Sequence, residues 1–210
     1  MGRIMINRLI EQRQIESLCH FTRVDNLNGI IEGGIMPRES LDISGRSYHP
    51  NDLKRYDGCP NAVSVSIEFP NYKMFYSLRK SNMDVEWVVL RLDSSILCDF
   101  ECAYCWTNAA DRSVTDIPLQ IRIGDDAFRD LFRDKIGYPK RNDLGIPSCY
   151  PTNPQAEVLV FDTIPVDYIQ KICFQKNMDM FHYRDIIPYN IDYGVESSMF
   201  MYRLDWEWWQ

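Results

Sequence analysis

The sequence predicts an α+β fold, in a single domain that spans residues 1–210, with several short strands and few helices. Three observations predict this class. Segments of strand length and strand pattern recur along the chain, for example at residues 62–69 and 156–161. Patterns with helical spacing are short and lie between them. The 210 residues suit one domain, and no repeat, low-complexity tract or linker divides them.

The first half of the chain alternates helix and strand signals. Residues 4–18 have a loosely helical pattern, and residues 19–22 can form a short strand. Asp25 is then expected to cap a short helix that stops at Gly33 and Gly34. Polar residues 37–61 predict a long loop with one helical turn at most. Further segments follow, namely a strand at 62–69, a short helix at 73–80 and strands at 86–92 and 103–106.

The second half begins with an amphipathic helix over residues 125–136. Phe128, Leu131 and Phe132 share one face of it, and Asp125 or Asp126 is expected to cap it. Residues 137–154 are rich in proline, glycine and asparagine and predict a loop. The remaining expected elements are a strand at 156–161, a helical turn at 166–169, a strand at 172–174 and an aromatic closing strand at 200–209.

Composition narrows the classes of protein. The chain has 45% hydrophobic and 25% charged residues, as globular proteins do, and no stretch of ~18 apolar residues that would span a membrane. Seven cysteines without a secretory signal predict a reduced, cytoplasmic protein. Cys102 and Cys105 form a C-x-x-C pair near Cys98, but no second pair completes four ligands, so we expect no metal.

The net charge of −7 argues against a protein whose whole surface binds nucleic acid. The charge is uneven, however. Residues 1–141 carry 19 basic and 20 acidic residues, whereas residues 142–210 carry 4 and 10. The nearly neutral first two-thirds leaves room for a local contact with a few nucleotides.

Two features suit ligand chemistry. His20 and Thr22 lie one residue apart, so a strand presents both on the same face, where both can hydrogen-bond a ligand. The alternative is a satisfied core histidine beside a strand-forming threonine. Glu157 opens an apolar strand after a long loop, where a carboxylate can be partly desolvated over a cleft. Its alternative is a solvent-facing glutamate.

The loop before that strand mixes cations and aromatic rings. Lys135, Lys140 and Arg141 alternate with Tyr138 and Tyr150. Such a mixture suits single-stranded nucleic acid, because phosphates meet charges and unstacked bases meet rings. The alternative is a solvated loop whose tyrosines fold onto the body of the protein. Glycine-rich phosphate loops, H-E-x-x-H zinc spacing and a G-x-S-x-G elbow are absent from the sequence.

Taken together, these segments resemble one family. His20-Phe21-Thr22, Asn26-Leu27, Ile30 and Gly33-Gly34-Ile35 resemble the N-terminal NAD-binding segment of the DarT-type nucleic-acid ADP-ribosyltransferases. Gln155-Ala156-Glu157-Val158-Leu159-Val160 resembles the strand that carries the catalytic glutamate of that family. The resemblance runs from about Leu18 to Phe174.

The resemblance implies a split β core that grips NAD in a cleft, with ADP-ribose transferred to a base, typically thymine, in single-stranded DNA. It implies a toxin paired with a macrodomain antitoxin, and no membrane. Because related transferases modify other acceptors, RNA and protein remain alternatives. A non-catalytic module that binds nucleic acid or a partner protein is the alternative outside the enzymes.

The resemblance also implies roles for residues of the cofactor cleft. His20 and Thr22 would hold the nicotinamide-side ribose and amide, Asn26 would support them, and Gly34 would let NAD approach the backbone. Glu157 would be the catalytic carboxylate, binding a ribose hydroxyl or deprotonating the acceptor base. The loop over residues 42–57 would cover NAD.

Other implied roles concern the phosphates and the acceptor. Arg46 and Arg55 would contact the pyrophosphate of NAD. Where the family often carries an arginine after the strand at 62–69, this chain has Asn71, and Lys73 is the nearest cation, so Lys73 is expected to act on the acceptor or the pyrophosphate. In the substrate loop, the residues expected to bind nucleic acid are Tyr138, Lys140, Arg141 and Tyr150.

Overall fold

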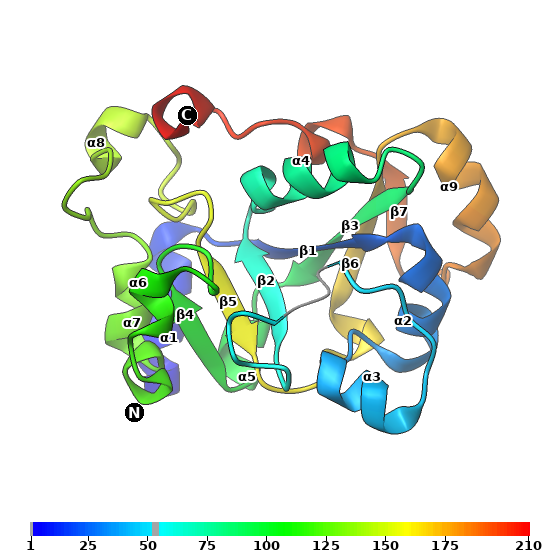
Figure 1. Ribbon diagram of the computed structural model, residues 1–210, viewed down its shortest axis with the longest axis horizontal. Helices are drawn as coiled ribbons and strands as arrows, with labels where there is room; N and C mark the ends of the chain where they lie inside the picture. The colour runs from blue at the N-terminus through cyan, green and yellow to red at the C-terminus, as the bar shows by residue number, and fades with distance from the viewer. Residues whose placement is uncertain (1, 52–54) are drawn as a thin grey trace.

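The computed structural model describes residues 2–51 and 55–210. Within these ranges seven strands form one sheet: β1 (Ser17–Arg23), β2 (Val63–Ile67), β3 (Trp87–Asp93), β4 (Cys102–Cys105), β5 (Glu157–Val160), β6 (Ile169–Phe174) and β7 (Asp192–Val195). Their order across the sheet is β4-β5-β2-β1-β3-β6-β7 (Figure 1). Neighbouring strands are antiparallel, except that β7 runs parallel to β6.

Short helices connect the strands. The α-helices are α1 (Gly2–Arg13), α2 (Leu27–Gly33), α3 (Arg38–Ser44), α4 (Tyr72–Ser81), α5 (Ile96–Asp99), α6 (Arg112–Thr115), α7 (Asp125–Asp130), α8 (Arg141–Leu144) and α9 (Asn177–Tyr183). The 3-10 helices are η1 (Val24–Asn26), η2 (Leu119–Arg122), η3 (Val166–Tyr168), η4 (Arg184–Ile186), η5 (Ser197–Phe200) and η6 (Trp206–Trp209). Together with the sheet they confirm the predicted α+β class.

The sheet is split near its middle. Strands β1 and β2 pair only at Leu18↔Ile67 and Cys19↔Ser66 and then diverge. On either side of this point the pairing is longer, because β1 runs against β3 along its whole length and β2 pairs with β5 through three residues. The gap between the diverging strands opens a cleft. This arrangement confirms the expected split β core.

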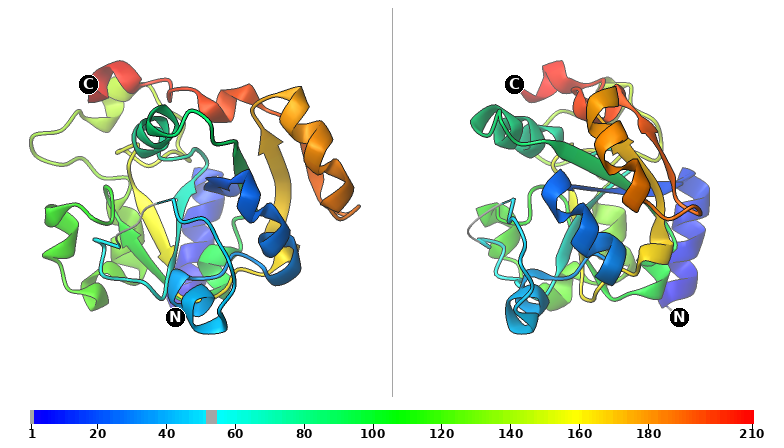
Figure 2. Two further views of the ribbon diagram at one scale, coloured as in Figure 1. Left: turned by 45° about the vertical axis from the view of Figure 1, so that its right-hand side comes forward. Right: turned by 90° about the vertical axis from the view of Figure 1, so that its right-hand side faces the viewer.

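Alternation along the strands separates the core from the cleft. Val88, Leu90 and Leu92 of β3 point into the largest apolar cluster, together with α1 and α7, whereas Trp87 and Val89 point to the other face, where α4 and η5 cover them. Figure 2 shows α1 and α3 on opposite sides of the sheet. The thick apolar layer under α1 therefore supports the strands on one face, α4 and η5 cover β3 on the other, and the cleft opens between β1 and β2.

Most expected strands and helices are confirmed with bounds that shift by one to three residues, but the helix expected at 4–18 ends at Arg13, and β1 already begins at Ser17. The closing strand at 200–209 is wrong, because η5 and η6 lie there. Arg203 binds the Asp205 carboxylate, and the Trp209 indole donates to the same carboxylate, so local side-chain contacts wind this segment into turns. The outer position beside β6 is taken by β7 instead, which the sequence analysis missed together with α9.

Three smaller expectations also need correction. Asp25 does not cap α2, because η1 continues directly into that helix and no side chain caps it. The helix expected at 125–136 ends at Asp130, since the Leu131 carbonyl accepts the Thr152 amide instead of continuing the helical pattern; neither Asp125 nor Asp126 caps it. The loops at 37–61 and 137–154 each contain a helix, α3 and α8.

Candidate active site

The cleft between β1 and β2 has a volume of about 260 Å³. Its walls are β1, α2, the segments at 46–51 and 55–57, β2 and the loop at 108–110. The structure brings together here all six residues expected to hold NAD and the expected catalytic carboxylate: His20, Thr22, Asn26, Gly34, Arg46, Arg55 and Glu157. The sequence therefore located the cleft.

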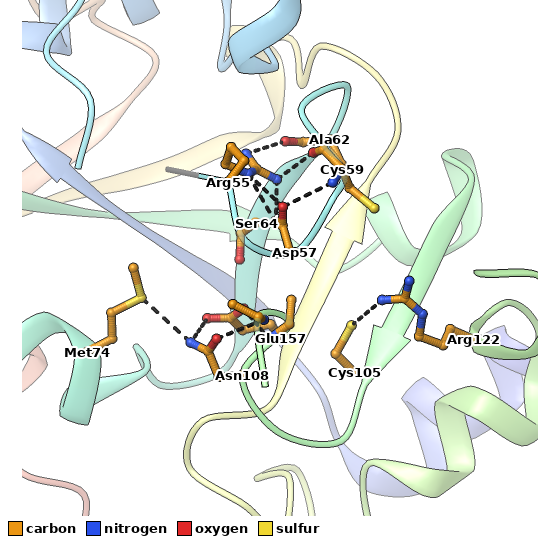
Figure 3. A network of polar contacts seen from close by, with 12 residues as sticks. Arg55, Asp57, Cys59, Ala62, Ser64, Met74, Cys105, Asn108, Arg122 and Glu157 are labelled. Carbon is orange, nitrogen blue, oxygen red and sulfur yellow. Dashed lines mark hydrogen bonds and ion pairs between the residues drawn. The ribbon is translucent and has the colours of Figure 1, made fainter. Parts of the chain in front are cut away.

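Glu157 begins β5 and its side chain is only 7% exposed. Three N–H groups converge on its carboxylate: Asn71 Nδ2 at 3.0 Å and Asn108 Nδ2 at 3.3 Å from Oε1, and the Ala109 backbone amide at 2.9 Å from Oε2. Figure 3 shows Asn108 and Glu157 side by side at the end of the strand, with Met74 beyond Asn108. Within the described residues, no hydrogen bond or ion pair joins Glu157 to a cationic side chain.

The orientation of both asparagines is fixed by the backbone. Asn71 Oδ1 accepts the Met74 amide at 3.2 Å and thereby caps α4, and Asn108 Oδ1 accepts the Ala110 amide at 2.9 Å. Because each amide oxygen is taken by an N–H donor, each NH₂ group must face Glu157. The site is therefore built to receive an acceptor-only group, which is an ionised carboxylate.

Burial raises the pKa of Glu157 above its ordinary value, and the hydrogen bonds from Ala109 and Asn71 offset part of this rise. The negative charge of Asp57 also raises it and Arg55 lowers it. Removal from water makes a carboxylate a stronger base, whereas hydrogen bonds to it make it a weaker one, and for Glu157 burial is the larger of the two effects. This combination suits proton abstraction.

His20 bridges the split in the sheet. Its Nδ1 lies 3.0 Å from the Ser64 carbonyl oxygen of β2. Because a carbonyl only accepts, Nδ1 carries the proton, and burial lowers the pKa of the ring, which leaves Nε2 as a neutral acceptor. A half-buried imidazole in this form can accept a hydrogen bond from a ligand hydroxyl.

Asn26 organises the wall opposite the sheet. Its Nδ2 donates to Thr22 Oγ1 and to the His49 carbonyl oxygen, both at 2.9 Å, and its Oδ1 accepts the His49 amide at 2.8 Å. The residue thus ties the segment at 46–51 to β1. Asn26 therefore holds the segment at 46–51, which covers the cleft, against β1. The Thr22 hydroxyl accepts from Asn26 and can still donate its own proton to another acceptor.

Gly34 has a structural reason to be glycine. Its φ is +79°, and a Cβ there would lie 2.4 Å from the Ile164 carbonyl oxygen. The neighbouring Ile35 pairs with Ile164 as an isolated β-bridge. The close backbone approach explains the glycine without NAD, although Gly34 also lines the cleft.

The two arginines expected at the pyrophosphate differ. Arg55 donates to both Asp57 carboxylate oxygens and to the carbonyls of Ala62 and Cys59, as Figure 3 shows, so its guanidinium holds its own loop together. Arg46 is exposed, with its guanidinium against Gly33. Within residues 2–51 and 55–210, Arg46 has no hydrogen bond or ion pair, so it is the better placed of the two for an incoming phosphate.

Lys73 is not brought to the cleft. Its Nζ donates to the Trp209 carbonyl oxygen, and the cleft wall contains its neighbour Met74 instead. The physical reason is helical geometry: successive residues of α4 point about 100° apart, so Asn71 and Met74 can face Glu157 while Lys73 turns to the C-terminal segment. This placement argues against the expected contact of Lys73 with the acceptor.

The four residues of the substrate loop that are expected to bind nucleic acid differ in their contacts and exposure. Arg141 donates to the carbonyls of Tyr150, Pro147 and Ser148 and so closes the loop on itself. Tyr150 is half-buried against Phe69. Tyr138 and Lys140 are exposed, and the Tyr138 ring lies 5.1 Å from Trp106.

The sequence analysis missed Asn51 and the role of Asn108. Asn51 donates to the Phe21 carbonyl oxygen at 2.8 Å, while its Oδ1 is buried in the cleft wall without a partner among the described residues. Asn108 belongs to a short polar run that follows β4, Thr107-Asn108-Ala109-Ala110. The sequence contains a signal for this role, because an asparagine followed by two small residues offers a carboxylate both a side-chain and a backbone N–H donor.

The cysteine pair is not a metal site. Cys102 and Cys105 lie three residues apart on β4 and so point to opposite faces of the sheet, into different apolar clusters. Burial raises the pKa of both thiols to about 12. All seven cysteines are free thiols. In the described part of the chain, no group of histidine, cysteine or acidic residues is arranged to hold a metal ion.

Comparison with known proteins decides the family. A family model described as "ssDNA thymidine ADP-ribosyltransferase, DarT" matches residues 19–203. The chain belongs to the DarT family. It is accordingly an NAD-dependent ADP-ribosyltransferase, with NAD as the co-substrate. No curated protein sequence matches it.

Solved DarT structures share its fold at low identity. Thermosipho africanus DarTG in complex with ADP-ribose is 15% identical with a TM-score of 0.61, covering 88% of this chain and 51% of that one. Thermus sp. 2.9 DarT in complex with carba-NAD+ is 12% identical with a TM-score of 0.58, covering 90% and 99%. The same Thermus protein in complex with ADP-ribosylated ssDNA is 12% identical with a TM-score of 0.54, covering 90% and 97%. The chain thus spans about half of the Thermosipho DarTG chain and nearly all of the Thermus DarT.

The lining of the cleft fits NAD. It offers the acceptors His20 Nε2 and Asn51 Oδ1 for ribose or carboxamide N–H and O–H groups, and the Arg46 guanidinium for phosphate. No helix among the described residues is long and apolar enough to cross a membrane.

Proposed function

We propose that this DarT-family enzyme transfers ADP-ribose from NAD to thymine in single-stranded DNA, with Glu157 as the catalytic base. One observation carries the proposal: the Glu157 carboxylate is buried in the cleft, held by three N–H donors and bonded to no cation among the described residues. A base of raised pKa at the mouth of a strand is what removal of a weakly acidic proton requires.

The chemistry of transfer assigns the remaining groups. Thymine in a nucleotide has one ring N–H, at N3. Glu157 takes that proton, the N3 electron pair forms a bond to the anomeric carbon of the nicotinamide-side ribose, and the bond to nicotinamide breaks with its electrons. The ribose gains oxocarbenium character on the way, and the nearby carboxylate stabilises the positive charge. Single-stranded substrate is needed because pairing hides N3.

NAD would be held by the cleft walls. His20 Nε2 accepts from a ribose hydroxyl, Thr22 and Asn51 meet the nicotinamide-side ribose and amide, and Asn26 keeps the cover in position. Arg46 contacts the pyrophosphate. Arg55 acts indirectly, by keeping residues 55–62 folded beside Glu157.

Tyr138 and Lys140 would contact the DNA beside the target base, because both are exposed on the loop before β5. The biological role proposed is that of a cytoplasmic toxin neutralised by a macrodomain antitoxin that removes the modification. The Thermosipho DarTG match supports a paired partner, since that chain is about twice as long as the matched part.

The test is incubation with NAD labelled in its ADP-ribose part and with oligonucleotides that differ in one base. Label on a single-stranded DNA with one thymine, and none when cytosine or N3-methylthymine replaces it, supports the proposal. Label only on RNA or on protein would overturn the DNA assignment. A chain that binds NAD but labels no acceptor would overturn the assignment of Glu157 as a base.

A further inference from the structure

The C-terminal segment carries exposed aromatic rings next to the active site. Tyr202 and Trp206 are stacked, with ring centroids 5.3 Å apart and 27° between their planes, and Tyr76 of α4 adds a third ring 5.4 Å from Tyr202. These three side chains, called the aromatic platform below, remain 38–42% exposed. Large rings held in contact yet open to solvent are typical of binding surfaces.

The aromatic platform is rigidly mounted. The buried Arg203 guanidinium binds the Asp205 carboxylate through two hydrogen bonds of 2.6 Å and donates to the carbonyls of Pro151 and Thr152. The Trp209 indole donates to Asp205 at 2.8 Å. Tyr202 and Trp206 flank this anchor, so their rings are held in place before any ligand arrives.

Contacts connect the aromatic platform to the catalytic carboxylate. Tyr72 packs edge-on against Tyr202, with centroids 5.8 Å apart, and directly follows Asn71, which donates to Glu157. Figure 1 shows the C-terminal segment running along α4, whose first turn also provides Met74 to the cleft. The rings therefore lie along one helix that begins at the active site.

Charge favours nucleic acid as the occupant. Helix α4 carries Lys73, Arg79 and Lys80 and no acidic residue, in a chain with a net charge of −7. Lys80 is exposed, whereas Lys73 and Arg79 donate to the carbonyl oxygens of Trp209 and Phe200 and contribute their positive charge from those fixed positions. Rings interleaved with cations along a helix suit a single strand, in which bases stack and phosphates meet charge.

We propose that the aromatic platform of Tyr76, Tyr202 and Trp206 stacks nucleotides that flank the target base, and so extends the DNA-binding surface beyond the cleft. The inference rests on the proposed function, because it presumes a single-stranded DNA acceptor. Trp206 lies outside residues 19–203, the part that the family model matches.

The test compares acceptors of different length. Trp206→Ala and Tyr76→Ala should each raise the KM of an oligonucleotide of about 12 nucleotides roughly ten-fold, as loss of one stacked base does. The KM of a trinucleotide, which does not reach the aromatic platform, and the KM of NAD should not change. Trp206→Phe should restore most of the affinity, because it keeps a ring. Tyr189→Ala removes a fully exposed ring between α9 and β7 and is the matched control.

Binding of a fluorescent oligonucleotide without NAD separates this inference from the proposed function. If the intact protein labels single-stranded DNA but Trp206→Ala and Tyr76→Ala bind the long oligonucleotide as the control does, the inference is overturned and the function stands. An equal loss for long and short acceptors also overturns it, because the effect would then arise in the cleft. Failure of the intact protein to label DNA overturns the proposed function itself.

Discussion

Glu157 and Asp205 are both buried carboxylates, 7% and 2% exposed, yet their surroundings differ. Asp205 faces the Arg203 guanidinium across a two-hydrogen-bond ion pair and accepts the Trp209 indole N–H as well. Glu157 accepts hydrogen bonds only from neutral donors, and burial raises its pKa above the ordinary value.

The difference separates a structural from a chemical role. A buried ion pair whose hydrogen bonds are all made fixes two segments relative to each other, here the C-terminal segment and the loop at 151–152. A buried carboxylate that is held only by neutral donors exchanges its proton at a higher pH than an exposed one, and it can stabilise a positive charge that forms beside it. Replacing Glu157 should therefore change mainly the rate of transfer, whereas replacing Asp205 should change mainly the free energy of unfolding.

The largest expected effect is on catalysis by Glu157→Gln. Removal of the base should lower kcat about 1,000-fold. The free energy of unfolding should change by less than about 1 kcal/mol, because the relief of charge burial offsets the poorer hydrogen bonding of an amide that faces donors. Single-turnover transfer and thermal melting measure the two. Unfolding together with the activity loss would mean that Glu157 is structural.

The reverse pattern is expected for Asp205→Asn. Loss of one member of a buried ion pair should lower the free energy of unfolding by about 3–5 kcal/mol, whereas kcat of the folded fraction should fall less than about ten-fold. Urea unfolding measures the first. The matched control is Asp192→Asn, which removes an exposed partner of Lys171 and should cost about 0–1 kcal/mol. Equal stability losses in both variants would contradict the comparison.

The next effect concerns the pH profile of Asn71→Asp. The new carboxylate can still accept the Met74 amide and cap α4, but it replaces the N–H donor that faces Glu157 with a negative charge. The pKa of Glu157 should rise further, because both changes disfavour its ionised form. Since the ionised base is the active form, kcat should begin to fall at a higher pH than in the wild type as the solution is acidified. An unshifted acidic limb would show that Glu157 is not the titrating base.

The smallest effect is expected in the substrate loop. Lys140→Ala removes an exposed cation and should weaken oligonucleotide binding about two- to three-fold, with a shallower salt dependence. Arg141→Ala removes a cation that holds three loop carbonyls and should instead lower the melting temperature by several degrees. Anisotropy titrations at two salt concentrations and melting curves distinguish them. A larger binding loss for Arg141→Ala at unchanged stability would mean that its guanidinium also reaches the DNA.

The sequence predicted the cleft better than the edges of the fold. Strands β1, β2, β3 and β5 have strong apolar patterns, and they position His20, Thr22 and Glu157 as expected. The strand predicted at 200–209 is wrong because an aromatic composition is equally compatible with a segment that a local ion pair holds in turns. The Arg203-x-Asp205 spacing indicates such a pair only when both side chains are known to be buried. Hydrophobic periodicity predicts which face of a segment is buried. In the C-terminal segment, pairing between side chains determines the local structure instead.

Hydrogen-bond partners limit what the sequence can predict about the cations of the site. Lys73, Arg55 and Arg141 are cations of the expected kind in the expected segments, but each binds backbone carbonyls of its own neighbourhood. A sequence shows that a cationic side chain is present, but it does not show whether that side chain donates its hydrogen bonds to backbone carbonyl oxygens. Asn71 stands where an arginine is expected from the family resemblance, and in this structure it donates to the Glu157 carboxylate.

Titration of Glu157 itself tests the central claim most directly. The side-chain carboxyl carbon can be followed by NMR in protein labelled at glutamate, and its signal assigned by its absence in Glu157→Gln. The account predicts a midpoint above the ordinary glutamate pKa of about 4.3 that coincides with the acidic limb of kcat for transfer to DNA. A midpoint at or below the ordinary value, or an acidic limb that does not follow it, would contradict the assignment of Glu157 as the base.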